Sequence, residues 1–291
     1  MSGSPDSRHR TGSRTADLLH ALDLQIRRAQ DAADADHVHD LRVATRRFAQ
    51  ALHIFEAGIA SAGRIRRELK PLMDAAGEVR DFDIAIKLIA KDNAAGEAKI
   101  VADIESKRAK AQSQLSAELQ KLASKKAITH WETSISRSKP TGASDGAVLL
   151  AAQAMFDRGD KAGKAKSSPK ALHRLRIAAK KLRYTLELGS NGISKKKIDK
   201  IGELQSKLGR IHDLEAVREL LKDYPGSKKL RATMRRKQRE LSREFHKFWS
   251  AEFESKKRQQ AWMSSIEGFA NSLQVARRKP AARALRNRAA A

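Results

Sequence analysis

Two stretches of the sequence, HDLRVATRRFAQALHIF (39–55) and HRLRIAAKKLRYTLEL (173–188), carry side chains suited to binding anions. Each opens with a histidine and then places basic residues three or four positions apart. Guanidinium groups donate paired hydrogen bonds to phosphate oxygens and keep their charge at any relevant pH. Lysine adds a mobile point charge, and histidine becomes charged when a bound anion raises its pKa. The residue types therefore predict a phosphate-rich, polyanionic ligand whose binding tightens between pH 7.5 and about 6.

The spacing places the basic side chains on one face of a helix that turns about 100° per residue. On the first helix the polar face comprises His39, Arg42, Arg46, Gln50 and His53. The opposite, apolar face comprises Leu41, Ala44, Phe48, Ala51, Leu52 and Phe55. On the second helix the polar face comprises His173, Arg176, Lys180, Arg183 and Tyr184. The apolar face comprises Leu175, Ala178, Leu182 and Leu186. Side chains three or four residues apart lie roughly 5–6 Å apart, so a linear polyanion can follow such a row of cations.

A solvated polar face is the ordinary explanation of one such helix. Solvated faces usually mix signs, because acids and bases at i, i+4 support each other. Between residues 39 and 55 the only acid is Asp40, against three arginines and two histidines. A row of one sign in both stretches favours anion binding.

A second pair of stretches follows the first pair in the same order. GEVRDFDIA (77–85) aligns with GRIHDLEAV (209–217), and the distance from histidine to aspartate is 42 residues in one copy and 40 in the other. The chain is therefore predicted to be a tandem duplication whose two units pack about a pseudo-twofold axis. Asp81 and Asp213 are predicted to hold an arginine in place or to cap a helix. The alternative for Asp81 is metal binding together with Asp83.

The composition predicts an all-α, intracellular protein. Residues that favour helices dominate the sequence, Lys and Arg outnumber Asp and Glu by 60 to 34, and the net charge is +26. There are no cysteines, which excludes disulfides and thiolate chemistry. No stretch has the ~20 apolar residues of a membrane helix, and the N-terminus has no secretory signal, so a cytoplasmic location without membrane insertion is expected.

The expected helices are 15–34, 37–58, 62–92 with a break near Pro71 or Gly77, 95–137, 147–158, 169–189, 195–223 with a break near Gly209, and 227–270. Residues 158–170 are expected to form a loop. Trp131, Trp249 and Trp262 are expected to pack between helices. The predicted organisation is a disordered basic N-terminus (1–14), a first helical repeat (15–138), a linker (139–146), a second helical repeat (147–270) and a basic C-terminal tail (271–291).

The paired motifs, with both trailing segments in order, resemble the CHAD family, named for a conserved-histidine α-helical domain. The resemblance covers about residues 15–270. It implies two four-helix-bundle-like repeats related by pseudo-twofold symmetry, with a basic central groove or pore. It also implies non-catalytic binding of inorganic polyphosphate, with no cofactor. Polyphosphate or polyhydroxyalkanoate granules are further partners that the resemblance suggests.

The resemblance places specific residues in the polyphosphate site, with weaker candidates on neighbouring helices. They are His39, Arg42, Arg46, Arg47, His173, Arg176, Lys180, Lys181 and Arg183, and then, as the weaker set, Lys70, Arg80, Lys207 and His212. Ala49 and Gln50 stand where the second copy has a basic–aromatic pair, so the first half-site is expected to be less positive.

Two alternatives remain open on the sequence. Nucleic-acid binding is consistent with the net charge, although aromatic residues make up only 4% of the chain, few for stacking on single strands. A phosphohydrolase would need a metal cluster or an activated nucleophile, and the basic helices show no paired acids at ligand spacing.

Overall fold

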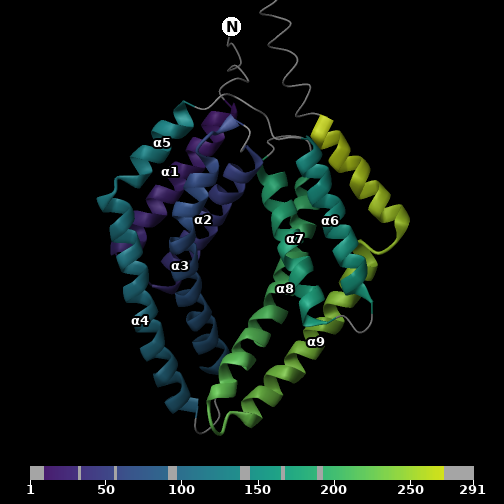
Figure 1. Cartoon of the computed structure of the whole chain (residues 1–291). Coiled ribbons are helices and arrows are strands. Elements are labelled where there is room, and N and C mark those ends of the chain that lie inside the picture. Colours follow the sequence, from purple (N-terminus) through teal and green to yellow (C-terminus); the bar gives the residue numbers. More distant parts are fainter. Residues whose placement is uncertain are drawn as a thin grey trace, which may run out of the picture.

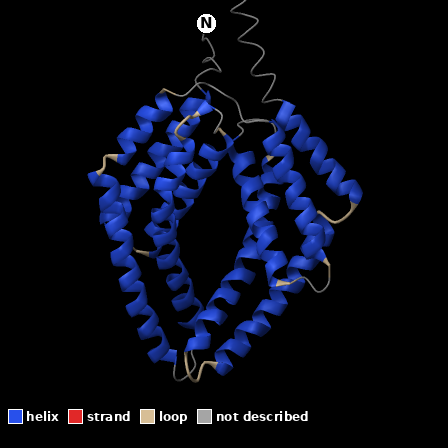
Figure 2. Cartoon of the chain, in the orientation of Figure 1, coloured by secondary structure: helices blue, strands red, loops and turns tan. Residues whose placement is uncertain are grey.

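The computed structural model of the chain describes residues 10–31, 34–55, 58–90, 97–137, 145–164, 168–188 and 193–271. Within these ranges every regular element is a helix and none is a strand (Figure 2), which confirms the all-α prediction. The helices are α1 (Arg10–Asp31), α2 (Ala35–Ile54), α3 (Ala62–Ala90), α4 (Glu97–Ser124), α5 (Ala127–Ser136), α6 (Asp145–Gly163), α7 (Pro169–Leu188), α8 (Lys195–Leu220), the 3-10 helix η3 (Leu221–Asp223) and α9 (Lys228–Glu252). A further helix spans 256–271. None of the helices in the described ranges is long and apolar enough to cross a membrane.

Three groups of buried apolar side chains hold the helices together. The first comes from α1 to α5 and contains Phe48 and Trp131, and the second comes from α6 to α9 and the helix 256–271 and contains Trp249. The third joins the ends of α3 and α4 to α8, η3 and α9 through side chains such as Ile89 and Leu221. Figure 1 accordingly shows α1–α5 on one side of the view and α6–α9 on the other, joined where α2 meets α7 and again at the lower tips.

The two motif helices bury the face that the sequence predicts. Leu41 and Phe48 of α2, and Leu175 and Leu182 of α7, are fully buried. Because the apolar face of each helix points into its own core, the basic residues lie on the other side. This is the side on which α2 and α7 contact each other.

The predicted breaks inside α3 and α8 are wrong. Both helices run without interruption past Pro71, Gly77 and Gly209. Apolar residues continue at helical spacing on either side of these positions, and Leu72 and Ile211 are among those buried. Burial of a continuous apolar face outweighs the ~1 kcal/mol that glycine costs in a helix, and the exposed Pro71 ring lies away from the core.

Two helices predicted as single elements are each divided. The stretch 95–137 breaks at Lys126, whose left-handed backbone (φ 47°) turns the chain into α5. That turn brings Trp131 into the first core, where its Nε1 donates a hydrogen bond to Glu68 at 2.6 Å. The stretch 227–270 breaks at Phe253, which is fully buried and stacks on Trp249 with ring centroids 5.1 Å apart.

All three tryptophans are buried, as predicted; Trp262, the third, lies 5.4 Å from the Phe253 ring. The predicted N-terminal boundary differs from the structure, because α1 already begins at Arg10, inside the stretch 1–14 expected to be disordered. Residues 1–9, most of the linker (139–144) and the tail from 272 lie outside the described residues.

The predicted loop at 158–170 is also partly wrong, because α6 continues to Gly163. Gly159 and Gly163 lie one helical turn apart against the indole of Trp249. A Cβ atom on Gly159 would come within 1.7 Å of the ring. The two glycines therefore allow α6 to pack closely on α9, and the buried indole extends the helix beyond the predicted end.

We expect Gly159→Ala to lower the free energy of unfolding by roughly 1–3 kcal/mol, the usual cost of forcing extra volume into a packed core. Urea denaturation followed by circular dichroism measures the change. The matched control is Gly268→Ala, because a Cβ at that helical position meets nothing within 4 Å. That control should gain up to about 1 kcal/mol from helix propensity. Equal effects of the two substitutions would contradict the packing described here.

Candidate anion-binding site

The basic faces of α2 and α7 meet between the two groups of helices. At their C-terminal ends, Gln50 donates a hydrogen bond to the Thr185 hydroxyl at 3.4 Å, and Arg47 forms an ion pair with Glu187 at 3.4 Å. These contacts fix the two helices beside each other. The rows of cations predicted from the sequence therefore face a common region instead of pointing to opposite sides of the molecule.

Four side chains in this region, Arg42, Arg46, Arg176 and Lys180, form what we call the cation cluster. Burial lowers the pKa of Lys180, and the charges of Arg176, Arg46 and Arg42 lower it further, to about 7. The pKa of Arg176 is also lowered, by burial and by the charge of Arg46, although acids nearby oppose the shift. Cations from α2 and α7 thus lie close enough to repel one another across the helix boundary.

Parts of this cluster have no ion-pair or hydrogen-bond partner among the described residues. Among the described residues, Arg46 and Lys180 have no ion-pair partner, and Nε of Arg176 is buried without a hydrogen bond. Partly buried cations of one sign are costly unless an anion is present. Such a cluster can accept a ligand that brings negative charge and hydrogen-bond acceptors.

Arg42 is held in place by α3. Its side chain is 13% exposed, and Nη1 donates a hydrogen bond to the Gly77 carbonyl at 2.9 Å. The same atom lies 3.5 Å from a carboxylate oxygen of Asp81. This contact agrees with the role predicted for Asp81, and most of its carboxylate remains exposed.

The second aspartate, Asp213 of α8, is placed near Arg176 and Lys180. Burial raises its pKa, while the charges of Arg176 and Lys180 oppose that shift. Asp213 also lowers the repulsion felt by Lys180, because its charge acts to raise the lysine pKa. The two aspartates thus moderate the positive charge of the cluster.

The histidines border the cluster, and His39 and His212 have lowered pKa values in the free protein. The His173 and His212 rings lie 5.0 Å apart, and burial, Arg176 and His173 lower the pKa of His212 to about 4. The pKa of His39 is lowered by burial and by Arg80. His39 and His212 are therefore neutral near pH 7, and the group poised to gain a proton on anion binding is Lys180.

Several predicted site residues lie outside the cluster. Arg47 and Arg183 both form ion pairs with Glu187, at 3.4 and 2.7 Å. One acid therefore neutralises two of the predicted site residues. Lys181 is exposed on α7. Lys70 is exposed and paired with Asp74. Arg80 remains near the site, because its charge acts on His39, Arg42 and Asp213.

Lys207 lies on the far side of α8 from the cluster. Its Nζ sits 5.2 Å from the Phe248 ring of α9 and 3.6 Å from Glu203. The face of α8 that contacts α7 instead carries Gln205, whose side chain accepts a hydrogen bond from Arg183 at 3.4 Å. The structure therefore does not bring Lys207 to the predicted site.

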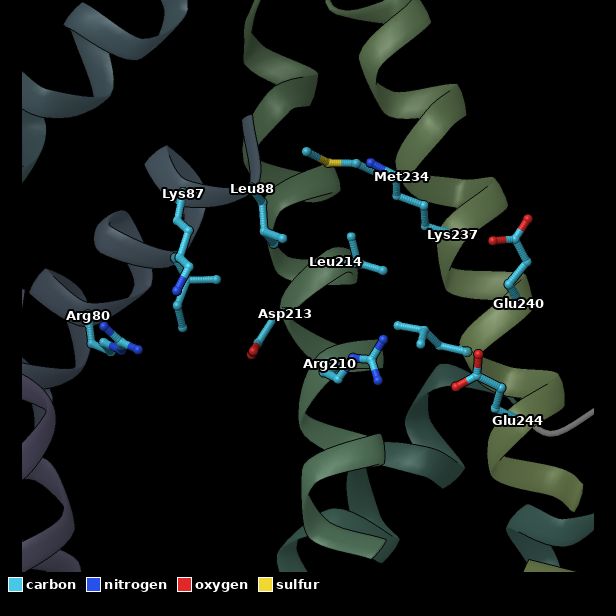
Figure 3. A pocket seen from close by; sticks show the side chains of 12 residues that line it. Arg80, Lys87, Leu88, Arg210, Asp213, Leu214, Met234, Lys237, Glu240 and Glu244 are labelled. Carbon is cyan, nitrogen blue, oxygen red and sulfur yellow. The ribbon is translucent and has the colours of Figure 1, made fainter. Parts of the chain in front are cut away.

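A cavity of about 490 Å³ adjoins the cluster through Arg80 and Asp213 (Figure 3). It lies between α3, α8 and α9, and its apolar wall includes Leu88 and Leu214. Lys87, Arg210 and Lys237 also line it, and none of these three was predicted. Lys87 follows Arg80 by two helical turns, and Arg210 lies next to Gly209 in the repeated stretch 209–217. The helical spacing of the two repeated stretches could therefore have indicated Lys87 and Arg210.

Gly77 and Gly209, matched in the two sequence copies, leave open space in the structure. A Cβ placed on either one would meet nothing within 4 Å. Neither glycine is therefore required by a neighbouring side chain. The Gly77 carbonyl instead accepts the hydrogen bond from the Arg42 guanidinium.

Comparison with known proteins gives a consistent result. The family model of the CHAD domain matches residues 14–222. The crystal structure of the CHAD domain from the plant Ricinus communis is similar, with a TM-score of 0.62, 18% identity, and coverage of 91% of this chain and 94% of that one. PptA from Streptomyces chartreusis has a TM-score of 0.59 at 16% identity, covering 89% and 99%. No curated protein sequence matches.

Proposed function

The chain belongs to the CHAD domain family, and from this premise we propose that it binds inorganic polyphosphate without catalysing a reaction of it. The single observation that supports this most strongly is the cation cluster of Arg42, Arg46, Arg176 and Lys180, in which repulsion and burial lower the pKa of a lysine to about 7. A linear chain of phosphates supplies repeated negative charge and acceptor oxygens along the line of the helices.

The proposal includes the arrangement of the two units, 15–138 and 147–270. Corresponding helices lie together, since α2 contacts α7 and α3 contacts α8. This is the pairing that a pseudo-twofold axis between duplicated units produces. We place the basic groove along this axis, with the cation cluster at its centre and the cavity beside Arg80 as its extension (Figure 3).

Chain length and salt test the proposal. Affinity should rise from triphosphate to long polyphosphate, because a longer chain contacts cations from both helices at once. It should also fall steeply with ionic strength, as binding of a polyanion by several cations does. Fluorescence anisotropy with labelled chains at fixed salt measures both. Equal affinity for triphosphate and a long chain would contradict a linear site.

Open space beside Gly77 leads to a further prediction. Gly77→Ala should raise the free energy of unfolding by about 0.5–1 kcal/mol, because alanine is the better helix former. The same methyl group should weaken polyphosphate binding several-fold, since it occupies the space where the polymer passes Arg42. Gly268→Ala is the matched control, with the same helical gain and no Cβ contact within 4 Å. Unchanged affinity in Gly77→Ala would place the polymer elsewhere.

Nucleic-acid binding is the second candidate function, favoured by the net charge of +26. The third candidate, a phosphohydrolase, predicts release of orthophosphate from polyphosphate when purified protein is supplied with Mg²⁺; we expect none.

Cytoplasmic polyphosphate granules present the proposed ligand at high density, and association with them or with polyhydroxyalkanoate granules is part of the proposal. Fluorescence imaging of the tagged protein tests it.

A further inference from the structure

We infer that Lys180 is a modification site, acylated by small acyl phosphates that the cation cluster binds through their phosphate group. The inference deepens the proposed function, because it uses the same cluster and gives it a means of regulation. It assigns to Lys180 the role of nucleophile, and to Arg46 and Arg176 the role of holding the donor.

The surroundings of Lys180 favour an uncharged amine. Arg42 and Arg46 act on it from α2, Arg176 acts from one turn earlier on α7, and Asp213 of α8 opposes them. Together with burial they lower the pKa of Lys180 to about 7. At pH 7.4 more than half of such an amine is neutral, whereas an ordinary lysine with pKa ~10.4 is about 0.1% neutral. Part of this gain is offset because a less basic nucleophile is intrinsically weaker.

The same neighbours select a donor that carries a phosphate. Nε of Arg176 is buried without a hydrogen bond, and Arg46 has no ion-pair partner among the described residues. Guanidinium groups bind phosphate oxygens in a bidentate manner. An acyl phosphate held in this way places its carbonyl carbon next to an amine on the same helix face as Arg176, since residues 176 and 180 are one turn apart.

The reaction balances without another reactant. The Lys180 nitrogen forms a bond to the carbonyl carbon, the bond from that carbon to the phosphate oxygen breaks, and the amine proton passes to the departing phosphate. Two arginines stabilise the charge that develops on the leaving group. The product is an amide, which carries no charge and cannot be protonated. Acylation would therefore prevent Lys180 from gaining a positive charge when polyphosphate binds, and would weaken binding there.

Two other lysines serve as internal controls. Lys181 is adjacent in sequence but exposed on α7. The pKa of Lys197 is lowered by burial, yet its amine bonds to Ser265 and the Ala261 carbonyl, with no arginine acting on it. A lowered pKa alone would activate both Lys180 and Lys197. Phosphate-directed acylation would favour Lys180.

Incubation of the full-length protein with acetyl phosphate at pH 7.4, followed by mass spectrometry of each lysine over time, tests the inference. We expect Lys180 to be acetylated on the order of tenfold faster than Lys181 or Lys197. Long polyphosphate should protect it, and Arg46→Gln should slow it several-fold. The acetyl ester of N-hydroxysuccinimide carries no phosphate. With this donor, Arg46→Gln should no longer slow acetylation of Lys180 through weaker binding of the donor. Acetylation of Lys180 no faster than of Lys181 would overturn the inference.

The outcomes also separate this inference from the proposed function. Tight polyphosphate binding without preferential acetylation of Lys180 rejects only the modification site. Preferential acetylation in a protein that does not bind polyphosphate rejects only the proposed function. Lys180→Arg stays charged and lacks the amine, so its polyphosphate affinity should not fall after treatment with acetyl phosphate.

Discussion

Replacing Arg42 and Arg176 together with alanine is expected to weaken binding of long polyphosphate by at least about 100-fold. Each arginine is mostly buried at the meeting point of α2 and α7, and each is placed to donate charged hydrogen bonds to phosphate. Hydrogen bonds to charged groups contribute roughly 1.5–3 kcal/mol each, and 1.4 kcal/mol is a factor of about ten in affinity. Isothermal titration calorimetry at fixed salt measures the loss.

The matched control for this pair is alanine at Arg235 and Arg236 of α9. Both are exposed, and their removal lowers the net charge by the same amount. Long-range attraction is thereby reduced equally, so only a small loss is expected. Thermal melts of both variants show whether the fold is kept. A loss of affinity equal to that of the Arg42 and Arg176 pair would mean that net charge, and not the cation cluster, binds the polymer.

The affinity for polyphosphate is expected to fall about tenfold per pH unit above pH 7. Arg42, Arg46 and Arg176 lower the pKa of Lys180 to about 7 in the free protein, with Asp213 opposing them. A bound polyanion raises that pKa, so the protein takes up a proton on binding. Binding is therefore tightest below about pH 7, where Lys180 is already charged, and weakens as pH rises towards the pKa of the bound state.

Lys180→Arg tests this assignment, because arginine stays charged throughout the range. We expect the variant to bind with nearly constant affinity between pH 7 and 8.5, while the wild type loses more than tenfold. Calorimetry in buffers of different ionisation enthalpy counts the proton taken up. His212 does not account for such a profile, since its pKa is about 4. An unchanged pH dependence in Lys180→Arg would assign the proton to another group.

The sequence was sufficient to predict the helical class, the family resemblance and the basic helices. Periodicity placed Leu41, Phe48, Leu175 and Leu182 on buried faces because burial of a helix depends on local spacing. Helix ends were less predictable, since a distant residue decides them. Trp249, about 90 residues away, extends α6 past the expected end by packing on Gly159.

The sequence predicted the residues of the site less completely than it predicted the helices. The pairing of Arg183 with Glu187 follows from i, i+4 spacing and could have been predicted. The pairing of Arg47 with the same acid could not, because it crosses between α2 and α7. The lowered pKa of Lys180 could not be predicted either, because Arg42 and Arg46 act on it from α2. Lys207 precedes His212 by five residues, which is about 140° around a helix that turns about 100° per residue, so the two side chains lie on different faces of α8.

Competition between long polyphosphate and duplex DNA at about 0.15 M salt, the physiological ionic strength, tests the central claim most directly. The cluster formed by α2 and α7 is proposed to fit a single flexible chain of phosphates. We therefore predict that polyphosphate displaces labelled DNA at a far lower phosphate concentration than DNA needs to displace labelled polyphosphate, and that the Arg42 and Arg176 double variant loses this preference. Equal displacement in both directions, unchanged in the variant, would contradict the account.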